Sequence, residues 1–303
     1  MTNGTSPLPL TDAVLTTRFC PRWSELLRRL YGYRFEGPFA VVPGLLGRAV
    51  LSYLPLLNYA DLDLEQAGAL AQRAGRRPYQ IRVLNPACHE FRKDDTVTMR
   101  IDMRGKSLDR VYHEIGPRIR RYIREKEREG YVLRVGNGRA LVQGFYEVFR
   151  EIMHRVGTPV FPVRLFELLV EMFDARYYVV TRGDTLAAAC VVVYDEAIAW
   201  MPWGGTRDAF VEHRPALLIY WGAIQEAHAA GKGIFDLGRS GYESGTYVFK
   251  TRFGAVPTKI DILTPRAESP YAKYDLVSRV WARLPGSIVN VAGPPLCRYL
   301  ADL

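Results

Sequence analysis

The sequence predicts an α/β protein, in which mixed sheets are flanked by helices. Three apolar runs separated by two tight turns follow one another between Tyr177 and Trp203, which is typical of a strand meander. Two helical patterns precede this meander. A third helical pattern follows it, closes at Gly231 and leads directly into the apolar run Ile234 to Leu237. An order of two helices, three strands, a helix and a strand predicts a sheet with helices packed on it.

Hydrophobic periodicity gives the expected elements along the chain. Helices are expected over residues 22–30, 60–75, a basic stretch beginning near Gly116 and Pro117, and residues 140–156, 162–173 and 215–230. Strands are expected over residues 39–42, 49–55, 80–84, 96–101, 177–181, 186–194, 197–203 and 234–237. The N-terminal series of helix, hairpin, helix and strand suits one small α/β unit ahead of the second.

Composition bounds the class of protein. With 303 residues, 48% hydrophobic and 24% charged, the chain is long enough for two domains. Residues 1–9 lack the basic start and apolar core of a secretion signal. The longest apolar region, residues 39–59, is broken by prolines and glycines and is not expected to span a membrane. A cytoplasmic protein is predicted, with a peripheral position on the inner membrane face as the alternative.

Cysteines and charge limit the cofactors and partners. The four cysteines are scattered without a C-x-x-C pair, so no metal site is expected and reduced thiols are the simple interpretation. The formal net charge is +9 and the isoelectric point is about 9.4. Such a balance favours polyanionic partners such as tRNA, a pyrophosphate-linked precursor or anionic lipid, without choosing among them.

One stretch, residues 233–254, has the features of an active-site edge. Its apolar strand stops at Gly238-Arg-Ser-Gly241, which leaves Arg239 and Ser240 at the carboxyl end, where ligands of α/β sheets bind. Ser244 is then placed to cap a short helix that ends near Gly254. That helix carries Tyr247, Phe249 and Lys250.

The motifs F-D-[LF]-G-R-S, G-T-Y-x-F-K and [FW]-G-A-x-P, which occur between Phe235 and Pro257, resemble the FemAB family. The resemblance runs from about Tyr33 to Ile262 and is greatest to FemAB-like proteins found beside exopolysaccharide and protein-sorting systems. That family joins aminoacyl groups, carried on tRNA, to amino groups of peptidoglycan precursors in the cell wall. Its fold implies tandem GNAT-like acyltransferase domains, here residues 1–112 and 113–268, followed by a C-terminal helical tail over residues 269–303.

The resemblance also implies roles for the residues of the main motif. Lys250 matches the family's lysine and is expected to be catalytic, stabilising an oxyanion or a leaving group. Phe249 and Tyr247 would shape the pocket. Arg239 and the neighbouring Ser240 would contact a phosphate or carboxylate of the substrate, although a buried pair of Arg239 with Asp236 is an equally ordinary role.

A basic helix beginning near Gly116 is the second candidate region. Arg118, Arg120 and Arg124 fall on basic positions of the helix that opens the second domain in FemAB-like proteins. Arginine there suits bidentate contact with phosphate. The alternative is a solvated basic face balanced by neighbouring glutamates.

Two further places are candidates for substrate binding. Trp203 and Gly204 end a predicted strand, and glycine allows close approach of a substrate to the backbone, although a plain strand-to-loop turn explains it equally well. Tyr220 matches the family's helix after that loop, with ordinary packing as the alternative. The segment Tyr53 to Tyr59 is similar to the strand and turn that line the acceptor side in FemAB relatives.

The predicted function is therefore an aminoacyl- or acyltransferase that forms an amide bond on an amino group of a cell-envelope precursor or related acceptor. The donor is already activated, so no cofactor is expected and aminoacyl-tRNA is the favoured donor. An N-acyltransferase of polysaccharide or small-molecule biosynthesis that uses acyl-CoA or an acyl carrier is the first alternative. The [RQ]-x-x-G-x-[GA] loop that holds coenzyme A in GNAT enzymes is not found. A non-catalytic basic binding module is the second alternative.

The tail contains a helical pattern from Tyr274 to Leu284 that Pro285 and Gly286 end. One interpretation is a helix that packs on the first domain. The other is that Trp281 and nearby arginines rest on an anionic membrane surface, close to a lipid-linked acceptor.

Overall fold

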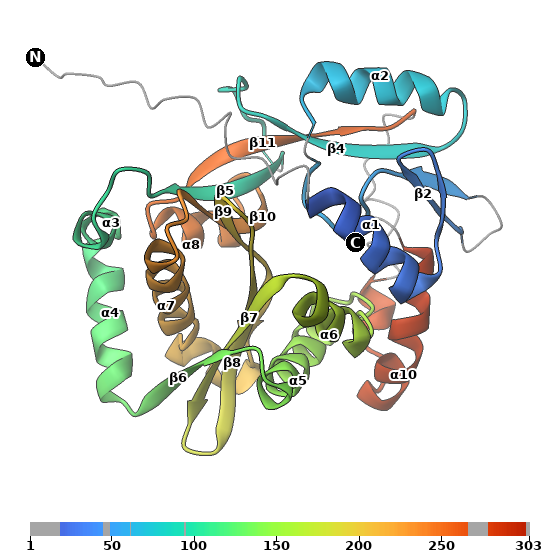
Figure 1. Cartoon of the computed structure of the whole chain (residues 1–303). Helices are drawn as coiled ribbons and strands as arrows, with labels where there is room; N and C mark the ends of the chain where they lie inside the picture. The colour runs from blue at the N-terminus through green and yellow to red at the C-terminus, as the bar shows by residue number, and fades with distance from the viewer. Residues whose placement is uncertain (1–18, 45–48, 61, 94, 266–277, 301–303) are drawn as a thin grey trace, which may run out of the picture.

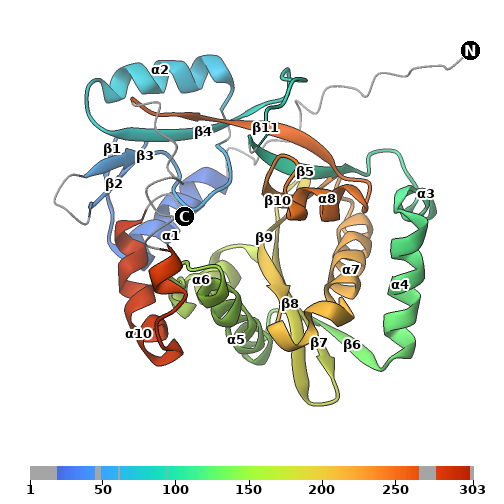
Figure 2. The same cartoon turned by 180° about the vertical axis from the view of Figure 1, so that it is seen from behind.

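The computed structural model describes residues 19–44, 49–60, 62–93, 95–265 and 278–300, which build one mixed sheet with helices on both faces (Figures 1 and 2). The sheet has eleven strands in the order β1-β2-β3-β4-β11-β5-β10-β9-β8-β7-β6. The strands are β1 (Arg34–Glu36), β2 (Phe39–Val42), β3 (Val50–Ser52), β4 (Tyr79–Asn85), β5 (Thr96–Asp102), β6 (Tyr131–Gly136), β7 (Asp174–Arg182), β8 (Thr185–Tyr194), β9 (Ile198–Thr206), β10 (Ile234–Gly241) and β11 (Val256–Leu263). The predicted mixed α/β class is confirmed.

Helices connect and cover these strands. They are α1 (Phe19–Tyr31), α2 (Leu64–Ala74), α3 (Leu108–Glu114), α4 (Pro117–Arg128), α5 (Arg139–Arg155), α6 (Val163–Met172), α7 (Ala216–Ala229), α8 (Gly245–Thr251) and α10 (Gly286–Leu296), with 3₁₀ turns η2 (Asp208–His213) and η3 (Cys297–Tyr299). Within the described ranges, every helix is too short or too polar to cross a bilayer.

The same strand arrangement occurs twice in the sheet. Near the N-terminus, β1, β2 and β3 form an antiparallel meander, and β3 then pairs in parallel with β4 across helix α2. Further along, β7, β8 and β9 form a second antiparallel meander, and β9 pairs in parallel with β10 across helix α7. A parallel pair requires such a helical crossover. The repeated pattern supports the tandem arrangement that the family resemblance implied.

Strands from distant parts of the chain meet at the centre of the sheet. β11 pairs with β4 through its second half and with β5 through its first half, and β5 pairs on its other edge with β10. One continuous sheet therefore contains strands of both predicted domains. The boundary near residue 112 stays a prediction.

The helices form a layer on each face, and each layer has its own core. Helices α1, α5 and α6 cover one face, where Trp23, Phe145 and Phe166 are among the buried side chains. Helices α4 and α7, with α3 and α8, cover the other face, where Phe235 and Phe253 are buried. Helix α2 packs on β4 over a small third cluster near the N-terminal edge of the sheet.

Local sequence signals set several element boundaries. The side chain of Asp63 accepts a hydrogen bond from Gln66 N at 2.7 Å in a capping box, so α2 begins at Leu64 and not at the predicted residue 60. Ser244 caps α8 as expected, accepting a hydrogen bond from Tyr247 N at 3.3 Å. Elements without a predicted range are β1, α3, β6, β11 and α10.

A buried carboxylate joins the N-terminal strands to β10. Asp236, which is 0% exposed, accepts hydrogen bonds at Oδ1 from Thr98 Oγ1 at 2.6 Å and from Gly238 N at 2.8 Å. Its Oδ2 accepts from Tyr59 Oη at 2.8 Å and from Arg100 Nε at 3.2 Å. Each carboxylate oxygen therefore has two donors, as a buried charge requires. We call these five residues the Asp236 network.

We expect Asp236→Ala to lower the free energy of unfolding by about 3–5 kcal/mol, because removing one partner of a buried ion pair leaves the other charge uncompensated. Urea unfolding followed by circular dichroism measures this change. The matched control is Asp102→Ala, which removes a partner of Arg104 at 2.9 Å in a pair whose side chains are 33% and 32% exposed. The control is expected to cost no more than about 1 kcal/mol. Equal losses for both variants would contradict the role of the network.

Candidate active site

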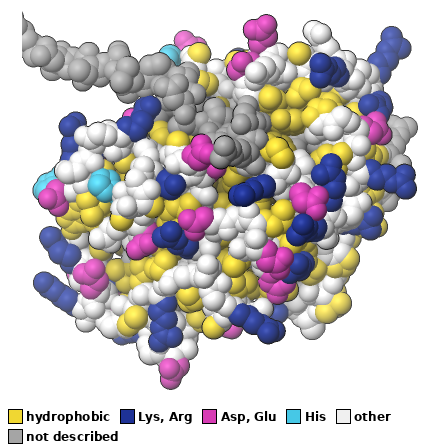
Figure 3. Space-filling model, viewed as in Figure 1, with side chains coloured by type: hydrophobic (Ala, Val, Ile, Leu, Met, Phe, Trp, Pro, Cys, Tyr) yellow, Lys and Arg dark blue, Asp and Glu magenta, His cyan; other side chains and the backbone are white. Residues whose placement is uncertain are grey.

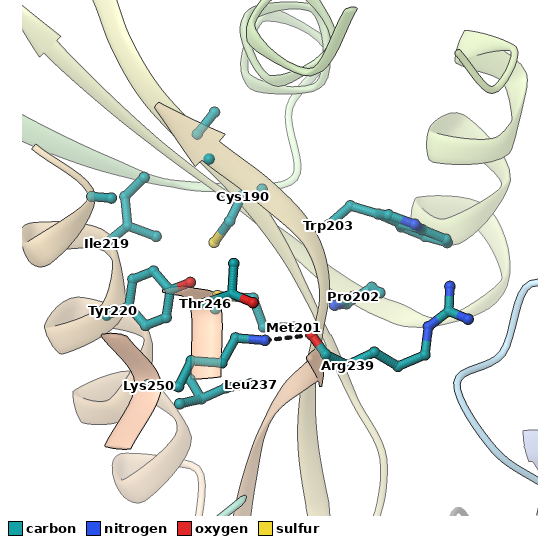
Figure 4. A pocket seen from close by; sticks show the side chains of 14 residues that line it. Cys190, Met201, Pro202, Trp203, Ile219, Tyr220, Leu237, Arg239, Thr246 and Lys250 are labelled. Atoms are coloured by element: carbon teal, nitrogen blue, oxygen red, sulfur yellow. Dashed lines mark hydrogen bonds between the residues drawn. The ribbon is translucent and has the colours of Figure 1, made fainter. Parts of the chain in front are cut away.

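The candidate active site lies where the parallel strands β9 and β10 part. They pair only from Ile234 to Asp236, opposite Ile198 to Trp200, although β9 continues to Thr206 and β10 to Gly241. A cavity of about 200 Å³ occupies the place where they separate (Figure 4).

A backbone irregularity in β10 accompanies the separation. The register of β10 against β5 shifts between Asp236 and Arg239, and Gly238 has φ +76°. A Cβ atom at Gly238 would lie 2.9 Å from the carbonyl oxygen of Met201. Only glycine therefore fits this bulge without moving β9.

Five elements line the cavity. The lining residues are Ala189 and Cys190 of β8, Met201 to Gly205 of β9, Ala216, Ile219 and Tyr220 of α7, Leu237 and Arg239 of β10, and Thr246 and Lys250 of α8. Five of the residues predicted for the site are thus brought together, namely Lys250, Trp203, Gly204, Tyr220 and Arg239. Ser240, Tyr247 and Phe249 do not line the cavity, and neither do the arginines of α4. The catalytic and binding roles of all these residues stay predictions.

Lys250 places a buried amine at the cavity. The residue is 7% exposed, and its Nζ donates hydrogen bonds to the carbonyl oxygens of Gly238 at 3.0 Å and Arg239 at 2.8 Å. An ammonium has three N–H groups, and these two carbonyl oxygens are the partners of Lys250 Nζ within the described residues. Burial lowers the pKa of Lys250 to about 8, against an opposing attraction from Asp236. The amine is therefore a cation at neutral pH that sits close to its titration point.

Side chains from the core beneath α4 and α7 form one wall of the cavity. In Figure 4, Tyr220, Cys190 and Thr246 gather on the side of Lys250. The ring of Tyr220 stacks on Phe253 at 5.1 Å and meets Phe249 edge-on at 5.0 Å. Burial raises the pKa of the Tyr220 hydroxyl and of the Cys190 thiol. Both groups are therefore neutral at physiological pH, and the Cys190 thiol is a weak nucleophile.

The opposite wall lies on the side of the core beneath α1, α5 and α6. Figure 4 shows the side chains of Trp203 and Arg239 extending away from Lys250, on the other side of the strands. The Trp203 ring lies edge-on to Phe161 at 5.5 Å and to Phe166 at 5.7 Å. The cavity therefore reaches both faces of the sheet at the place where the strands part.

The two glycines after Trp203 have a packing reason. A Cβ atom at Gly204 would lie 2.4 Å from Cys190 Cβ, and one at Gly205 would lie 2.7 Å from Ile152 Cδ1. Glycine here permits the close approach of β9 to β8 and to α5. Both glycines also line the cavity, and a substrate-binding role for Gly204 stays a prediction.

An unpartnered donor lies next to the bulge. Asn58 is 6% exposed, and its Nδ2 has no hydrogen-bond partner among the described residues. A Cβ atom at Gly238 would be 3.5 Å from this nitrogen. Asn58 belongs to the segment Tyr53 to Tyr59, which is similar to the acceptor-side segment of FemAB relatives. A buried amide without a partner is costly, so this donor is a candidate contact for a bound acceptor.

The basic helix α4 starts beside the helix that carries Lys250. Gly116 N donates a hydrogen bond to the carbonyl oxygen of Arg252 at 2.9 Å, just after the end of α8. Arg118 Nε donates to Tyr122 Oη at 2.9 Å, and Arg214 lies over the same ring at 5.0 Å.

The remaining arginines of α4 extend this surface. Hydrogen bonds from Arg118 and Arg214 lower the pKa of Tyr122, as a locally positive potential does. Arg121 lies over the Tyr122 ring at 5.3 Å, Arg120 lies over the Tyr112 ring at 5.6 Å, and Arg124 is exposed. The exposed surface of α4 is therefore rich in arginine, although Arg121 also pairs with Glu125 at 3.2 Å.

Several lining residues were not predicted from the sequence. Cys190 and Met201 were expected only as parts of buried strands, and Ile219 and Thr246 were not considered for the site. Apolar residues in strands carry no chemical signal of their own, and only the β9–β10 separation places them at a cavity. Among the described residues, no group of three or more His, Cys, Asp or Glu side chains could hold a metal ion.

Comparisons with known proteins identify similar folds. Residues 117–251 match the model of a family described as an acetyltransferase (GNAT) domain. The chain is similar to the crystal structure of FemX, with a TM-score of 0.56 and 13% identity over 85% of this chain and 93% of that chain. No curated protein matches the sequence.

Two further solved structures are similar over most of both chains. L-PGS from Bacillus licheniformis has a TM-score of 0.51 and 13% identity over 87% of this chain and 97% of that one. The C-terminal domain of a putative lysylphosphatidylglycerol synthetase from Agrobacterium fabrum has a TM-score of 0.53 and 12% identity, covering 87% and 96%. Residues 117–251 thus resemble a GNAT domain, and the chain shares its fold with FemX. The FemAB resemblance seen in the sequence is confirmed at the level of the fold.

We expect Lys250→Met to raise the melting temperature at pH 7 by a few degrees, because the variant removes a buried charge. Each kcal/mol of added stability raises the melting temperature by about 2–4 °C in chains of about this size. The folded pKa of Lys250 is about 8, whereas an unfolded lysine has a pKa of about 10.4. Between these values the unfolded chain binds more protons, so the stability of the wild type rises with pH across this window. The advantage of the variant should shrink over the same range.

Differential scanning calorimetry from pH 6.5 to 10.5 measures this difference. Lys232→Met is the matched control, because the Lys232 amine donates to the Glu196 carbonyl oxygen at 3.3 Å in an exposed contact. A Lys250→Met protein that is less stable at pH 7, or a difference that does not vary with pH, would show that the buried charge is not costly.

Proposed function

We propose that this protein transfers an aminoacyl group from aminoacyl-tRNA to an amino group of a cell-envelope precursor or related acceptor. The observation that carries the proposal is the buried Lys250 ammonium, held by two backbone carbonyls where β9 and β10 part. The FemAB resemblance of the surrounding motif and the fold shared with FemX support it.

Aminoacyl transfer from an activated ester requires the protein mainly to position the reactants and to place a positive charge near the reacting oxygen. A neutral amine attacks the ester carbonyl of the donor, a C–N bond forms, and the negative charge of the tetrahedral intermediate collects on oxygen. The C–O bond to the tRNA ribose then breaks, and the proton lost by the amine goes to the ribose oxygen. The Lys250 ammonium would stabilise the oxyanion or the departing oxygen. No covalent enzyme intermediate is needed, which fits a site whose thiol and phenol are neutral.

The size of the cavity fits the binding of only the reacting end of the donor. Its volume of about 200 Å³ is below the roughly 300–1,000 Å³ typical of sites for whole small molecules. The reacting end of a donor would enter, while its polyanionic part would stay outside. The start of α4, tied to the end of α8 at Arg252, offers Arg118 and Arg120 for the phosphates.

The connection between β9 and α7 favours tRNA over coenzyme A. An acyl-CoA enzyme needs free backbone N–H groups at a glycine-rich helix start to hold the pyrophosphate. Here residues 207–215 contain no glycine, η2 occupies most of the connection, and Pro215 directly precedes α7. Leu217 N and Leu218 N already donate to the carbonyl oxygens of Arg214 at 3.2 Å and Pro215 at 3.1 Å.

We expect Lys250→Ala to reduce acyl transfer by about a hundredfold or more with the fold intact, as loss of one oxyanion-stabilising group does. Lys250→Arg should retain part of the activity, because it keeps a cation. The wild-type rate should fall as pH rises through about 8, where Lys250 loses its proton. Lys250→Arg should lack this fall, since arginine stays charged. Turnover of Lys250→Ala equal to that of the control Lys232→Ala would remove Lys250 from the mechanism.

The donor is tested by direct competition of two labels. Lysate acceptors are supplied either with labelled amino acid, tRNA and synthetases or with labelled acyl-CoA, and half of each reaction is treated with RNase. We expect incorporation that needs tRNA and is lost with RNase. Incorporation that survives RNase and depends on coenzyme A would replace this proposal by the N-acyltransferase alternative.

A further inference from the structure

Two arginines from different elements converge on one tyrosine of α4. Arg118 lies in the first turn of α4, and Arg214 lies between η2 and α7. Arg118 Nε donates a hydrogen bond to Tyr122 Oη at 2.9 Å. The guanidinium carbon of Arg214 lies 5.0 Å from the centre of the Tyr122 ring, and its side chain donates to the same hydroxyl. Two positive charges are therefore held around one phenol oxygen. We call these three residues the Tyr122 cluster.

In the part of the chain that the structure describes, no carboxylate pairs with either arginine of the Tyr122 cluster. On α4, Glu125 pairs instead with Arg121 at 3.2 Å, and on η2, Asp208 pairs with an arginine of α5. Glu127 of α4 and Glu212 of η2 are exposed. Like charges that are held close together repel each other, so an anion bound between the two guanidinium groups would stabilise the arrangement.

The backbone of Arg214 has a conformation that favours glycine. Its φ is +55° and its ψ is +42°, in the left-handed region. Bonds on both sides fix this geometry, because Arg214 N donates to the carbonyl oxygen of Val211 at 3.2 Å and its own carbonyl oxygen accepts from Leu217 N at 3.2 Å. Strained backbone of this kind is concentrated at functional sites. An arginine at a position that glycine would occupy more easily indicates that its side chain is used.

The Tyr122 cluster lies beside the elements that line the cavity. Ala216 lines the cavity and follows Arg214 by two positions, which span at most about 7 Å. Helix α4 packs on α7 (Figure 2), and its start at Gly116 is bonded to Arg252, just after the helix that carries Lys250. Projecting Lys and Arg side chains, with acidic ones among them, occupy the left-hand edge of Figure 3, the side on which α4 lies in Figure 1. Substrate atoms just outside the cavity would therefore meet the cluster.

We propose that Arg118, Arg214 and Tyr122 form a subsite for one phosphate group of the substrate. Guanidinium groups bind phosphate through paired N–H···O bonds, and the phenol supplies an O–H donor. The connection between β9 and α7 would thus use side-chain donors where acyl-CoA enzymes use backbone N–H groups. The identity of the ligand rests on the proposed aminoacyl transfer, which makes it a phosphodiester of the donor RNA. A nucleotide pyrophosphate is the other source of the same chemistry.

The test measures binding to the full chain without any reaction. The probes are a fluorescein-labelled RNA hairpin with an unpaired C-C-A 3′ end, followed by anisotropy at low salt, and ADP, followed by calorimetry. We expect Arg118→Gln and Arg214→Asn each to weaken RNA binding by about tenfold, as loss of one charge-assisted hydrogen bond does. Asparagine replaces Arg214 because it tolerates the left-handed conformation. Each variant should also reduce the slope of log Kd against log salt by about 0.7–0.9, since one phosphate contact is lost.

Arg121→Gln is the matched control. It removes the same charge from the same helix, and Arg121 lies over the same ring at 5.3 Å, but its charge is already paired with Glu125. We expect this variant to weaken RNA binding by less than about twofold. Thermal unfolding checks that all variants are folded. Equal losses for Arg121→Gln and Arg118→Gln would show a general effect of charge and would overturn the subsite.

The two probes separate failure of the subsite from failure of the proposed function. ADP binding that Arg118→Gln and Arg214→Asn weaken, without RNA binding by the wild type, would support the phosphate subsite but contradict a tRNA donor. RNA binding that neither variant weakens would overturn the subsite and leave the proposed aminoacyl transfer standing. A wild-type chain that binds neither probe would also overturn the subsite.

Discussion

The hydrogen bonds of the Asp236 carboxylate are the constraint on which the rest of the structure depends. A fully buried charge is stable only when its oxygens are satisfied, and here the donors come from Thr98, Arg100 and Tyr59 as well as from Gly238 N. The N-terminal strands are thereby joined to β10. The same carboxylate holds the bulge whose Gly238 carbonyl accepts from Lys250. One buried side chain thus fixes both the junction of the sheet and the position of the amine.

Most of the second half of the fold could be predicted from the sequence, because its elements are long and strongly patterned. The meander from Tyr177 to Trp203 and the following helix appear as β7, β8, β9 and α7. Strands β1 and β6 were missed because β1 has only three residues and the edge strand β6 leaves Val132 51% exposed. The insertion of β11 between β4 and β5 joins residues 156 to 182 positions apart, which no local pattern encodes.

For the site, the motif signals identified the element that bears the amine but not the cavity around it. Lys250 and Arg239 come from one short stretch of sequence, yet their side chains extend in different directions (Figure 4). Gly204 could be noticed as a glycine at a strand end, but its close packing on Cys190 could not be predicted from the sequence. Asp236 could be noticed as a charge in an apolar strand. Its three side-chain donors lie 136 to 177 positions earlier in the chain, so their convergence was beyond sequence reasoning.

The place of β11 has a consequence for how the chain acquires its structure during synthesis. Strands β4 and β5 are both complete by residue 102, but they are not neighbours in the sheet, and the strand between them begins at Val256. Two strand edges near the N-terminus therefore stay unpaired while more than half of the polypeptide leaves the ribosome. Open edges invite pairing with other chains, and late, distant pairing slows folding. The nascent protein thus passes through a long interval in which its own C-terminal part must outcompete intermolecular association.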